Sequence, residues 1–326
     1  MNHEKDSVSA KDVVFFHRKE FIDIDGHKHG MIIEGGNPDN PVLLFLHGGP
    51  GFPQYPMIKA SGLEWTEDMT VCYWEQRGAG MSFDAKTQGS LTLESYITDI
   101  VEVTKYLKKE FNKEKIYLFG HSWGTLLGSI AASKYPEHYH AYIGAGQLGR
   151  HKESNEETYY YLLETAIAKG DKKAEQDIRK VNFDENFYKS QPYRKILNRY
   201  LIKYGGGMKR KNYTQRQGLA EIFTCKAYTW KERLNIPRGI FTTYEAMAGI
   251  MATVDVAELA PRFEIPVYII QGKYDYQTSY NEAKRFYDLI EAPDKKMFTF
   301  EDCAHTPFLE DQKYFLNEVL RKEILP

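Results

Sequence analysis

The chain has 326 residues, which is enough for one large α/β domain with an insertion or for two domains. Its 43 basic and 45 acidic residues nearly balance, and this argues against a nucleic-acid-binding surface or a strongly anionic partner. We therefore expect the partner to be a small molecule or a short peptide, and no nucleic acid.

Cysteine content and hydropathy indicate in which cellular compartment the protein acts. The three cysteines, Cys72, Cys225 and Cys303, are odd in number and scattered, which excludes a disulfide framework and fits a reducing cytoplasm. The first six residues carry charges and no apolar run, unlike a secretory signal. No apolar stretch approaches the roughly 20 residues of a membrane span. The sequence therefore predicts a cytoplasmic protein that does not cross a membrane, in which Cys303 is a packing residue.

The first part of the chain predicts strands. Residues 13–34 alternate and turn at Asp25 and Gly26, which indicates an antiparallel hairpin. Two continuous apolar runs follow, Val42–Leu46 and Thr70–Trp74, of the kind found in strands buried on both faces. Each run ends in a glycine-rich loop. We expect both loops at the carboxyl edge of one parallel sheet, where open α/β sheets bind their ligands.

A crossover helix is predicted next. Apolar residues keep one helical face from Leu93 to Phe111, with Thr92 as the N-cap. An apolar, β-prone run over residues 115–119 follows, and a short strand is predicted over residues 141–145. This alternation of strand, helix and strand is typical of a parallel sheet.

The alternation of strands and helices ends after residue 147. Residues 148–262 are charged, tyrosine-rich and helical in pattern, whereas core-type strands return over residues 266–270 and 296–300, before a terminal helix. We therefore predict an α/β fold with a mostly parallel central sheet flanked by helices. Residues 1–147 and 263–326 form its core, and residues 148–262 form an inserted helical cap. The alternative, a second independent domain, is disfavoured by the return of the strands.

The strand over residues 115–119 enters the sequence Gly120-His121-Ser122-Trp123-Gly124, and helical spacing follows. A Gly-x-Ser-x-Gly motif between a strand and a helix is typical of a serine nucleophile on a sharp turn. Glycines at the ends of the motif let the strand and the helix approach closely. Ser122 is therefore the predicted nucleophile, and the alternative is an ordinary turn serine.

A serine hydroxyl needs a base and a third group that orients the base. His305 follows the last predicted strand, and Asp275 follows the strand before it, so the chain order is Ser, acid, His. Asp302 and Asp255 are rivals for the acid. Asp302 is too close to His305 along the chain to reach its ring easily, and Asp255 lies in the cap or at its exit. We favour Asp275 over both.

The negative oxygen that forms during acyl transfer requires two backbone N–H donors. One donor is predicted to be Trp123, the residue after the nucleophile. The other should come from the loop after Val42–Leu46, where we favour Gly49 and keep Gly48 as the alternative.

These motifs resemble those of the proline iminopeptidases, a branch of the α/β-hydrolase superfamily. Residues 47–51 read HGGPG, residues 75–82 read EQRGAGMS, and residues 120–124 read GHSWG. The resemblance covers roughly residues 13–147 and 263–326. It implies an α/β-hydrolase core with a helical cap, no metal or other cofactor, and release of an N-terminal residue, often proline, from short peptides. Glu75 and His121 depart from the aspartate and glycine common in that family.

The resemblance also implies that carboxylates of the cap bind the free amine of the substrate. Glu221, Glu232 and Glu245 are the candidates in this chain, and for each the alternative is a solvated helix face. An amine in a desolvated pocket needs a paired carboxylate.

The sequence therefore predicts a serine hydrolase, specifically an aminopeptidase that acts on short peptides. Two alternatives stay open. A carboxylesterase or amidase for neutral small molecules would have no carboxylate pair facing Ser122. A ligand-binding or sensing protein would keep the hydrolase fold without rapid turnover.

Overall fold

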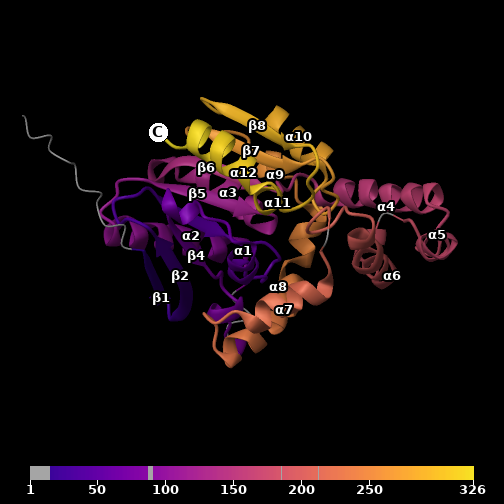
Figure 1. The fold of residues 1–326 in the computed structure, drawn as a ribbon, viewed down its shortest axis with the longest axis horizontal. Helices are drawn as coiled ribbons and strands as arrows, with labels where there is room; N and C mark the ends of the chain where they lie inside the picture. Colours follow the sequence, from indigo (N-terminus) through magenta and orange to yellow (C-terminus); the bar gives the residue numbers. More distant parts are fainter. Residues whose placement is uncertain (1–14, 87–90, 185, 212) are drawn as a thin grey trace, which may run out of the picture.

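The structure is a computed structural model that describes residues 15–86, 91–184, 186–211 and 213–326. The first six residues and the start of the predicted hairpin therefore lie outside the described residues. One eight-stranded sheet runs through the molecule in the order β1-β2-β4-β3-β5-β6-β7-β8 (Figure 1). The strands are β1 (Phe16–Ile24), β2 (His27–Gly35), β3 (Val42–Leu46), β4 (Thr70–Trp74), β5 (Ile116–His121), β6 (Tyr139–Ala145), β7 (Val267–Gly272) and β8 (Lys295–Phe300).

The predicted hairpin and the mostly parallel sheet are confirmed. β1 and β2 pair antiparallel on either side of Asp25 and Gly26, whose φ angles of 52° and 75° form the tight turn. β2 pairs antiparallel with β4, and every pair from β4 to β8 is parallel. β5 lies between β3 and β6, so the strand that leads to Ser122 is central.

Helices cover the sheet and fill the segment between β6 and β7. The longer ones are α1 (Tyr55–Ser61), α2 (Leu93–Glu110), α3 (Trp123–Lys134), α4 (His151–Ala168), α5 (Lys172–Arg179), α6 (Gln191–Ile196), α7 (Gln215–Thr224), α8 (Trp230–Thr253) and α10 (Tyr280–Leu289). The short ones are η1 (Trp65–Glu67), η2 (Gly80–Ser82), η4 (Pro136–His138), η5 (Phe187–Lys189), α9 (Val256–Leu259), α11 (Pro307–Glu310) and α12 (Gln312–Tyr314). Two π-helices, η6 (Leu197–Leu201) and η7 (Phe315–Ile324), continue α6 and α12. The predicted crossover helix is α2, and its N-cap Thr92 accepts a hydrogen bond from Ser95 N at 3.1 Å.

Side chains of the parallel strands alternate between two hydrophobic clusters, because successive residues of a strand point to opposite faces. Leu44 and Leu46 of β3 pack in one cluster with α2, α3, α9 and α10. Leu43 and Phe45 pack in the other cluster with α1, α11 and η7. Both faces of the sheet are therefore covered, which explains why its strands are continuous apolar runs.

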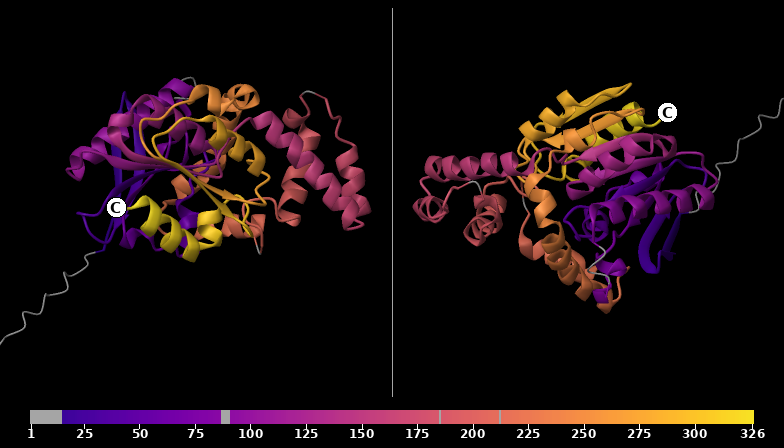
Figure 2. Two further views of the ribbon diagram at one scale, coloured as in Figure 1. Left: turned by 90° about the horizontal axis from the view of Figure 1, so that it is seen from above. Right: turned by 180° about the vertical axis from the view of Figure 1, so that it is seen from behind.

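The helices of residues 148–262 have hydrophobic contacts of their own. α4, α5, α6 and η6 share a third cluster, built around Leu162, Ile178 and Tyr193. These helices project beyond the sheet, whereas α7 and α8 lie against the side of the core (Figures 1 and 2). No helix of the described ranges is long and apolar enough to cross a membrane.

Helix α8 rests directly on the two glycine-rich loops of the core. A Cβ atom added to Gly51 would lie 2.2 Å from Thr243 Oγ1 of α8, and one added to Gly239 of α8 would lie 2.4 Å from Gly78 O. Real Cβ atoms do not approach other atoms so closely, so glycine is required on both sides of this contact.

Helix α3 makes a similar approach to the sheet. A Cβ atom added to Gly124 would lie 2.1 Å from Leu46 O of β3, and one added to Gly120 would lie 2.5 Å from Gly124 O. The glycines of the motif therefore set the distance between β5, α3 and β3.

We expect Gly124→Ala to lower the free energy of unfolding by about 1–3 kcal/mol, because the new methyl group would force α3 away from β3. Gly249→Ala is the matched control, since Gly249 lies in α8 with nothing within 4 Å of an added Cβ. Alanine is the better helix former, so this control should be neutral or slightly stabilising. Urea unfolding measures both, and equal effects would contradict the packing argument.

Candidate active site

Ser122 lies on the turn between β5 and α3, as the sequence predicts. Its φ of 55° and ψ of −121° belong to a strained region for a residue with a side chain. The turn is held by a hydrogen bond from Ser122 N to Ala145 O of β6, at 3.0 Å. A Cβ atom added to Gly48 would lie 3.0 Å from Ser122 Cβ, so the loop after β3 lies directly against the serine.

The structure brings Asp275 and His305 together. Asp275 follows β7, His305 follows β8, and both are buried. The distance from His305 Nδ1 to Asp275 Oδ2 is 2.8 Å. Asp275 Oδ2 also accepts hydrogen bonds from Gln271 Nε2 and Thr278 Oγ1, each at 2.9 Å. The carboxylate is thus fixed by several donors and can hold the imidazole in one orientation.

His305 lies beside the serine turn. Its ring centroid is 4.7 Å from that of His121, the residue before Ser122. A Cβ atom added to Gly146 would lie 3.0 Å from His305 Cε1, and Gly146 follows the residue whose carbonyl holds Ser122 N. Ser122 and the pair of His305 and Asp275 therefore follow three strands of the sheet at the same carboxyl edge.

A relay of hydrogen bonds joins the loop after β3 to the His305 loop. Gly48 N donates to Gln54 Oε1 at 3.0 Å, and Gln54 Nε2 lies 2.6 Å from His121 Nδ1. His121 Nε2 lies 2.8 Å from His305 O. These contacts require a neutral imidazole that accepts at Nδ1 and donates from Nε2. Burial, together with the neighbouring His305, lowers the pKa of His121 well below its ordinary value, which keeps the ring neutral.

The relay also affects which backbone N–H groups are available as the predicted oxyanion donors. Because the Gly48 N–H is donated to Gln54, it is already engaged within the loop. Gly49 and Trp123 both line the cavity that contains Ser122. The Trp123 indole is held by a hydrogen bond from Nε1 to Gln76 Oε1 at 3.1 Å. This arrangement favours Gly49 over Gly48 as the second donor.

His47 positions the same loop. It is buried, and burial lowers its pKa to about 4, so the ring is neutral near pH 7. Its Nδ1 lies 2.8 Å from Gly48 O, and its Nε2 accepts from Gln76 N at 3.1 Å. His47 therefore links the loop after β3 to the loop after β4.

A cavity of about 560 Å³ opens above Ser122, between the core loops and the helices of residues 148–262. Most of its lining is apolar or aromatic: Phe52, Trp123, Leu148, Tyr188, Leu197, Leu201, Ile202, Met208, Tyr213, Leu219, Ile222, Ile240, Tyr244, Met251 and Tyr276. Its polar lining includes His151, Asn155 and Arg194. Among the described residues that line it, none carries a carboxylate.

The three glutamates predicted to bind an amine lie elsewhere. Glu221 lines a separate cavity and accepts a hydrogen bond from Tyr213 Oη at 3.2 Å. Glu232 caps α8 and pairs with Lys19 at 2.6 Å. Glu245 is exposed on α8. The structure does not bring any of them to Ser122.

The rival acids are engaged outside the cavity. Asp255 caps α9 and pairs with Arg285 at 2.7 Å. Asp302 pairs at the surface with Arg210 at 3.0 Å. Cys303 is buried, and burial raises the pKa of its thiol to about 12, which agrees with a packing role.

Sequence reasoning missed the residues with which α4 and α6 line the cavity. His151 and Asn155 come from the start of α4, and Arg194 comes from α6. Nothing in their local sequence marks them, because helical spacing alone does not indicate which face of an inserted helix meets the core.

Glu75, which departs from the family pattern, is buried between the core and α8. It accepts hydrogen bonds from Met81 N at 2.5 Å and from Tyr228 Oη. Burial nevertheless raises its pKa from 4.5 to about 8, because the charged carboxylate is desolvated. Glu75 is therefore mostly protonated near pH 7.

Comparisons with known proteins agree with this geometry. The sequence profile of the family described as the alpha/beta hydrolase fold matches residues 41–312. The chain is 29% identical over 306 residues to the probable aminopeptidase YbaC of Bacillus subtilis, covering 92% of this chain and 94% of that protein. It is 26% identical over 303 residues to a proline iminopeptidase of Saccharolobus solfataricus, covering 87% and 85%.

A solved structure, the proline iminopeptidase of Mycobacterium smegmatis, has the same fold. Its TM-score is 0.66 at 18% sequence identity, over 93% of this chain and 96% of that chain. The resemblance to proline iminopeptidases, and the predicted fold class, are thereby confirmed.

We expect Glu75→Gln to remove a pH dependence of stability. The folded protein keeps a proton on Glu75 that the unfolded chain releases, so the stability from this group is complete below pH 4.5 and is lost as the pH rises towards 8. Relative to the variant, the wild type should lose up to about 1.4 kcal/mol per pH unit within this window. Urea unfolding at several pH values measures the difference, and a difference independent of pH would contradict the assignment.

We expect Gln54→Leu to lower the free energy of unfolding by about 1–3 kcal/mol, because it leaves Gly48 N and His121 Nδ1 buried without their partner. Gln312→Leu is the control. Its amide donates to Ser61 O at 2.9 Å at a half-buried site that water can reach, so its loss should cost less. A smaller loss for Gln54→Leu than for the control would show that the relay is dispensable.

Proposed function

Because the chain belongs to the alpha/beta hydrolase fold family, we propose that it is a serine hydrolase that releases the N-terminal residue of short peptides through an acyl-enzyme. The observation that carries this proposal is the pair of His305 and Asp275, 2.8 Å apart, beside the strained turn of Ser122. In this proposal the helices of residues 148–262 form the cap of the site.

In the proposed mechanism, His305 Nε2 takes the proton of Ser122 Oγ as the oxygen attacks the substrate carbonyl. Asp275 accepts the Nδ1–H of the imidazole and stabilises the resulting imidazolium. The negative carbonyl oxygen accepts hydrogen bonds from the N–H groups of Gly49 and Trp123. His305 then protonates the leaving amine. A water molecule, deprotonated by His305, attacks the acyl carbon, and His305 returns this proton to Ser122 Oγ as the bond between the acid and the serine breaks.

The names of the relatives support a peptide substrate, since they are an aminopeptidase and proline iminopeptidases. The apolar lining of the cavity supports a small apolar acyl group. Because none of the described residues that line the cavity carries a carboxylate, the proposal has the substrate amine bind in its neutral form. The pKa of a peptide amine is about 7.7–8.0, so deprotonation near pH 7 costs only about 1 kcal/mol.

The second candidate is a carboxylesterase or amidase for neutral small molecules. The absence of a carboxylate among the described residues of the cavity favours it. It shares Ser122, His305 and Asp275 with the first candidate and differs only in the substrate.

The cysteines support our proposal that the protein acts in the cytoplasm. Cys72, Cys225 and Cys303 are free thiols, as expected in a reducing compartment.

We expect Ser122→Ala to reduce kcat by about 10⁴-fold or more, because the attacking oxygen is removed. Thermal unfolding should stay close to that of the wild type, since the buried polar contacts of the turn among the described residues are made by the Ser122 backbone, such as Ser122 N to Ala145 O. Ser129→Ala, which changes a buried serine of α3 outside the cavity lining, is the control and should retain turnover. Equal turnover by Ser122→Ala in a clean preparation would refute the nucleophile.

The substrate is tested with prolyl and alanyl arylamides, their N-acetyl counterparts and a short-chain aryl ester. For an aminopeptidase that binds the neutral amine, kcat/KM of the arylamides should rise with pH as the amine loses its proton. N-acetylation should abolish their hydrolysis. If the acetylated compounds and the ester are cleaved faster than the free amines, the second candidate replaces the first.

A further inference from the structure

The chain is nearly neutral overall, but one part of it is strongly basic. Residues 186–220 contain nine of the 43 basic residues and none of the 45 acidic residues. This stretch runs through α6, η6 and the start of α7, next to the cavity above Ser122. The near balance of the whole sequence therefore conceals a local positive charge.

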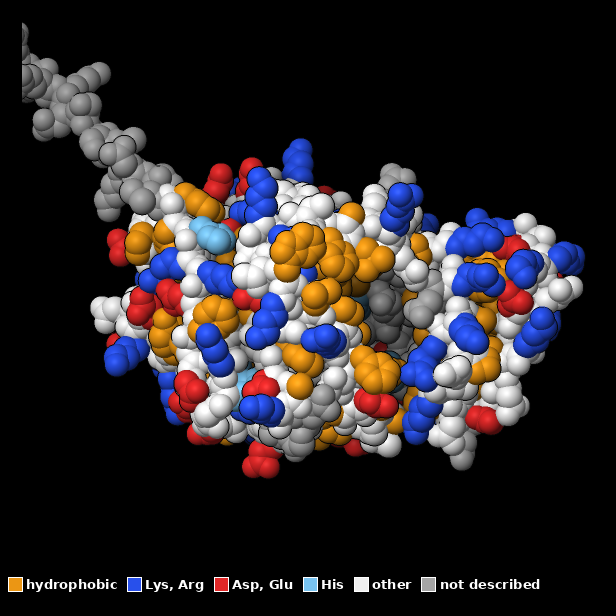
Figure 3. All heavy atoms as spheres, turned by 90° about the horizontal axis from the view of Figure 1, so that it is seen from below, with side chains coloured by type: hydrophobic (Ala, Val, Ile, Leu, Met, Phe, Trp, Pro, Cys, Tyr) orange, Lys and Arg blue, Asp and Glu red, His pale blue; other side chains and the backbone are white. Residues whose placement is uncertain are grey.

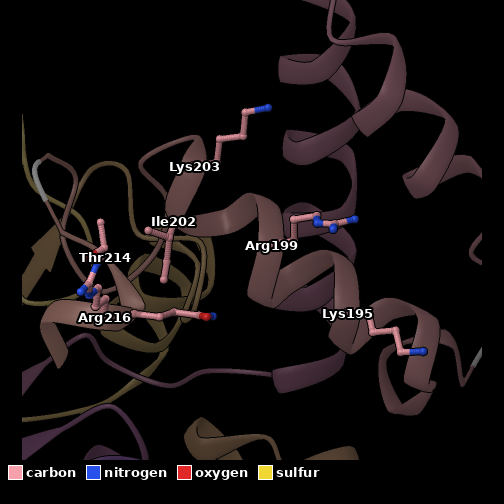
Figure 4. Close-up of a pocket in the computed structure, with 7 residues that line it drawn as sticks. Lys195, Arg199, Ile202, Lys203, Thr214 and Arg216 are labelled. Carbon is pink, nitrogen blue, oxygen red and sulfur yellow. The ribbon is translucent and has the colours of Figure 1, made fainter. Parts of the chain in front are cut away.

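The basic stretch borders an open groove of about 740 Å³ on the surface of the helical segment. Lys195, Arg199 and Lys203 lie four residues apart on α6, η6 and the helical residues that follow, so they share one side of the helix. Thr214 and Arg216 line the groove from the start of α7 (Figure 4). The charged ends are spread along the groove and do not gather on one point.

Two of the four cations are partly neutralised and two are not. Arg199 Nη1 lies 3.4 Å from Asp177, and Lys203 Nζ lies 2.5 Å from Asp171. For Lys195 and Arg216 the described part of the chain provides no ion-pair partner. In the space-filling view, Lys and Arg side chains are numerous on the projecting helical part of the molecule, at the right (Figure 3). The groove therefore has a net positive potential.

The groove adjoins the cavity of the active site. Ile202 and Gln215 line both, and Arg194, which lines the cavity, precedes Lys195 of the groove. Because Ser122 lies at the inner end of the cavity and the groove lies at the surface, the part of a substrate that extends outward meets the groove. In a peptide held by its N-terminal residue at Ser122, that part is the leaving peptide.

We propose that this groove binds the carboxylate of the leaving peptide, so that the enzyme prefers short peptides with a free C-terminal carboxylate or an acidic side chain. The inference rests on the proposed peptidase function. Exposed charges at the rim of a site raise the rate of encounter and weaken with salt, so the preference should be largest at low ionic strength. The spread of the four cations suits an extended chain whose length varies.

The test compares an alanyl tripeptide with a free C-terminus and its C-terminal amide. In the wild type at low salt, we expect kcat/KM to be about 3–10-fold higher for the free acid, the range that two exposed ion pairs provide. The double variant Lys195→Glu, Arg216→Glu should lose or reverse this preference. Added salt should remove it from the wild type.

Lys169→Glu is the matched control, because it reverses an exposed charge of the same helical segment outside the groove. It should keep the preference of the wild type. An alanyl arylamide, which has no carboxylate, should be cleaved equally by all three proteins. Equal rates for acid and amide, or a preference that persists in the double variant, would overturn the proposal while arylamide turnover shows that the peptidase function stands.

Two further experiments address the position of the carboxylate and the possibility that the enzyme cleaves esters and not peptides. A tripeptide amide with glutamate at its third position carries its carboxylate on a side chain and not at the C-terminus. If the wild type prefers either carboxylate over the uncharged alanyl tripeptide amide, and the double variant does not, the result supports binding in the groove. If only an aryl ester is cleaved, the peptidase function fails. The comparison is then repeated with esters whose alcohol carries or lacks a carboxylate. Equal rates for these esters would overturn the proposal that the groove binds a carboxylate.

Discussion

The strained backbone of Ser122 is the constraint on which the site depends. A φ of 55° costs a residue with a side chain about 1–3 kcal/mol and persists only where the surrounding structure enforces it. Here β6 holds the Ser122 N–H, and Gly120 and Gly124 let β5 and α3 meet. The central strand, the packed helix and the neighbouring strand together keep the hydroxyl at the sheet edge.

The glycine-rich loops pack against two parts of the structure, the turn of Ser122 and helix α8. On one side, the loop after β3 approaches Ser122 so closely that Gly48 has no room for a side chain. On the other side, Gly51 and Gly78 meet α8. The loop after β3 is therefore held between Ser122 and α8, and the neutral rings of His47 and His121 bind Gly48 O and Gln54 of this loop.

Much of the core was predictable from the sequence, because buried parallel strands are continuous apolar runs and their ends are marked by glycines. β3 and β4 begin and end where predicted, and Asp275 and His305 meet because both follow neighbouring strands. The roles of residues in the helical segment 148–262 were not predictable in the same way. Glu221, Glu232 and Glu245 are candidates by residue type alone, whereas in the structure Glu221 accepts a hydrogen bond from Tyr213, Glu232 pairs with Lys19 and Glu245 is exposed.

A net charge near zero for the whole chain also does not exclude a locally basic segment such as residues 186–220. Net charge sums over all surfaces, whereas a substrate meets only one of them. Residues of buried hydrogen-bond networks, such as Gln54, could not be predicted from the sequence either. Their roles depend on contacts between segments that are far apart in the sequence.

The helical segment separates β6 from β7, yet these strands pair directly, from Tyr142 with Val267 to Ala145 with Ile270. Loop-closure entropy grows only with the logarithm of loop length, so doubling such an insertion costs about 0.6 kcal/mol. The cluster around Leu162, Ile178 and Tyr193 gives the insertion contacts of its own, which shortens the loop that has to be closed. The insertion can therefore be lengthened over evolution at little entropic cost, while Asp275 and His305 return to the same place.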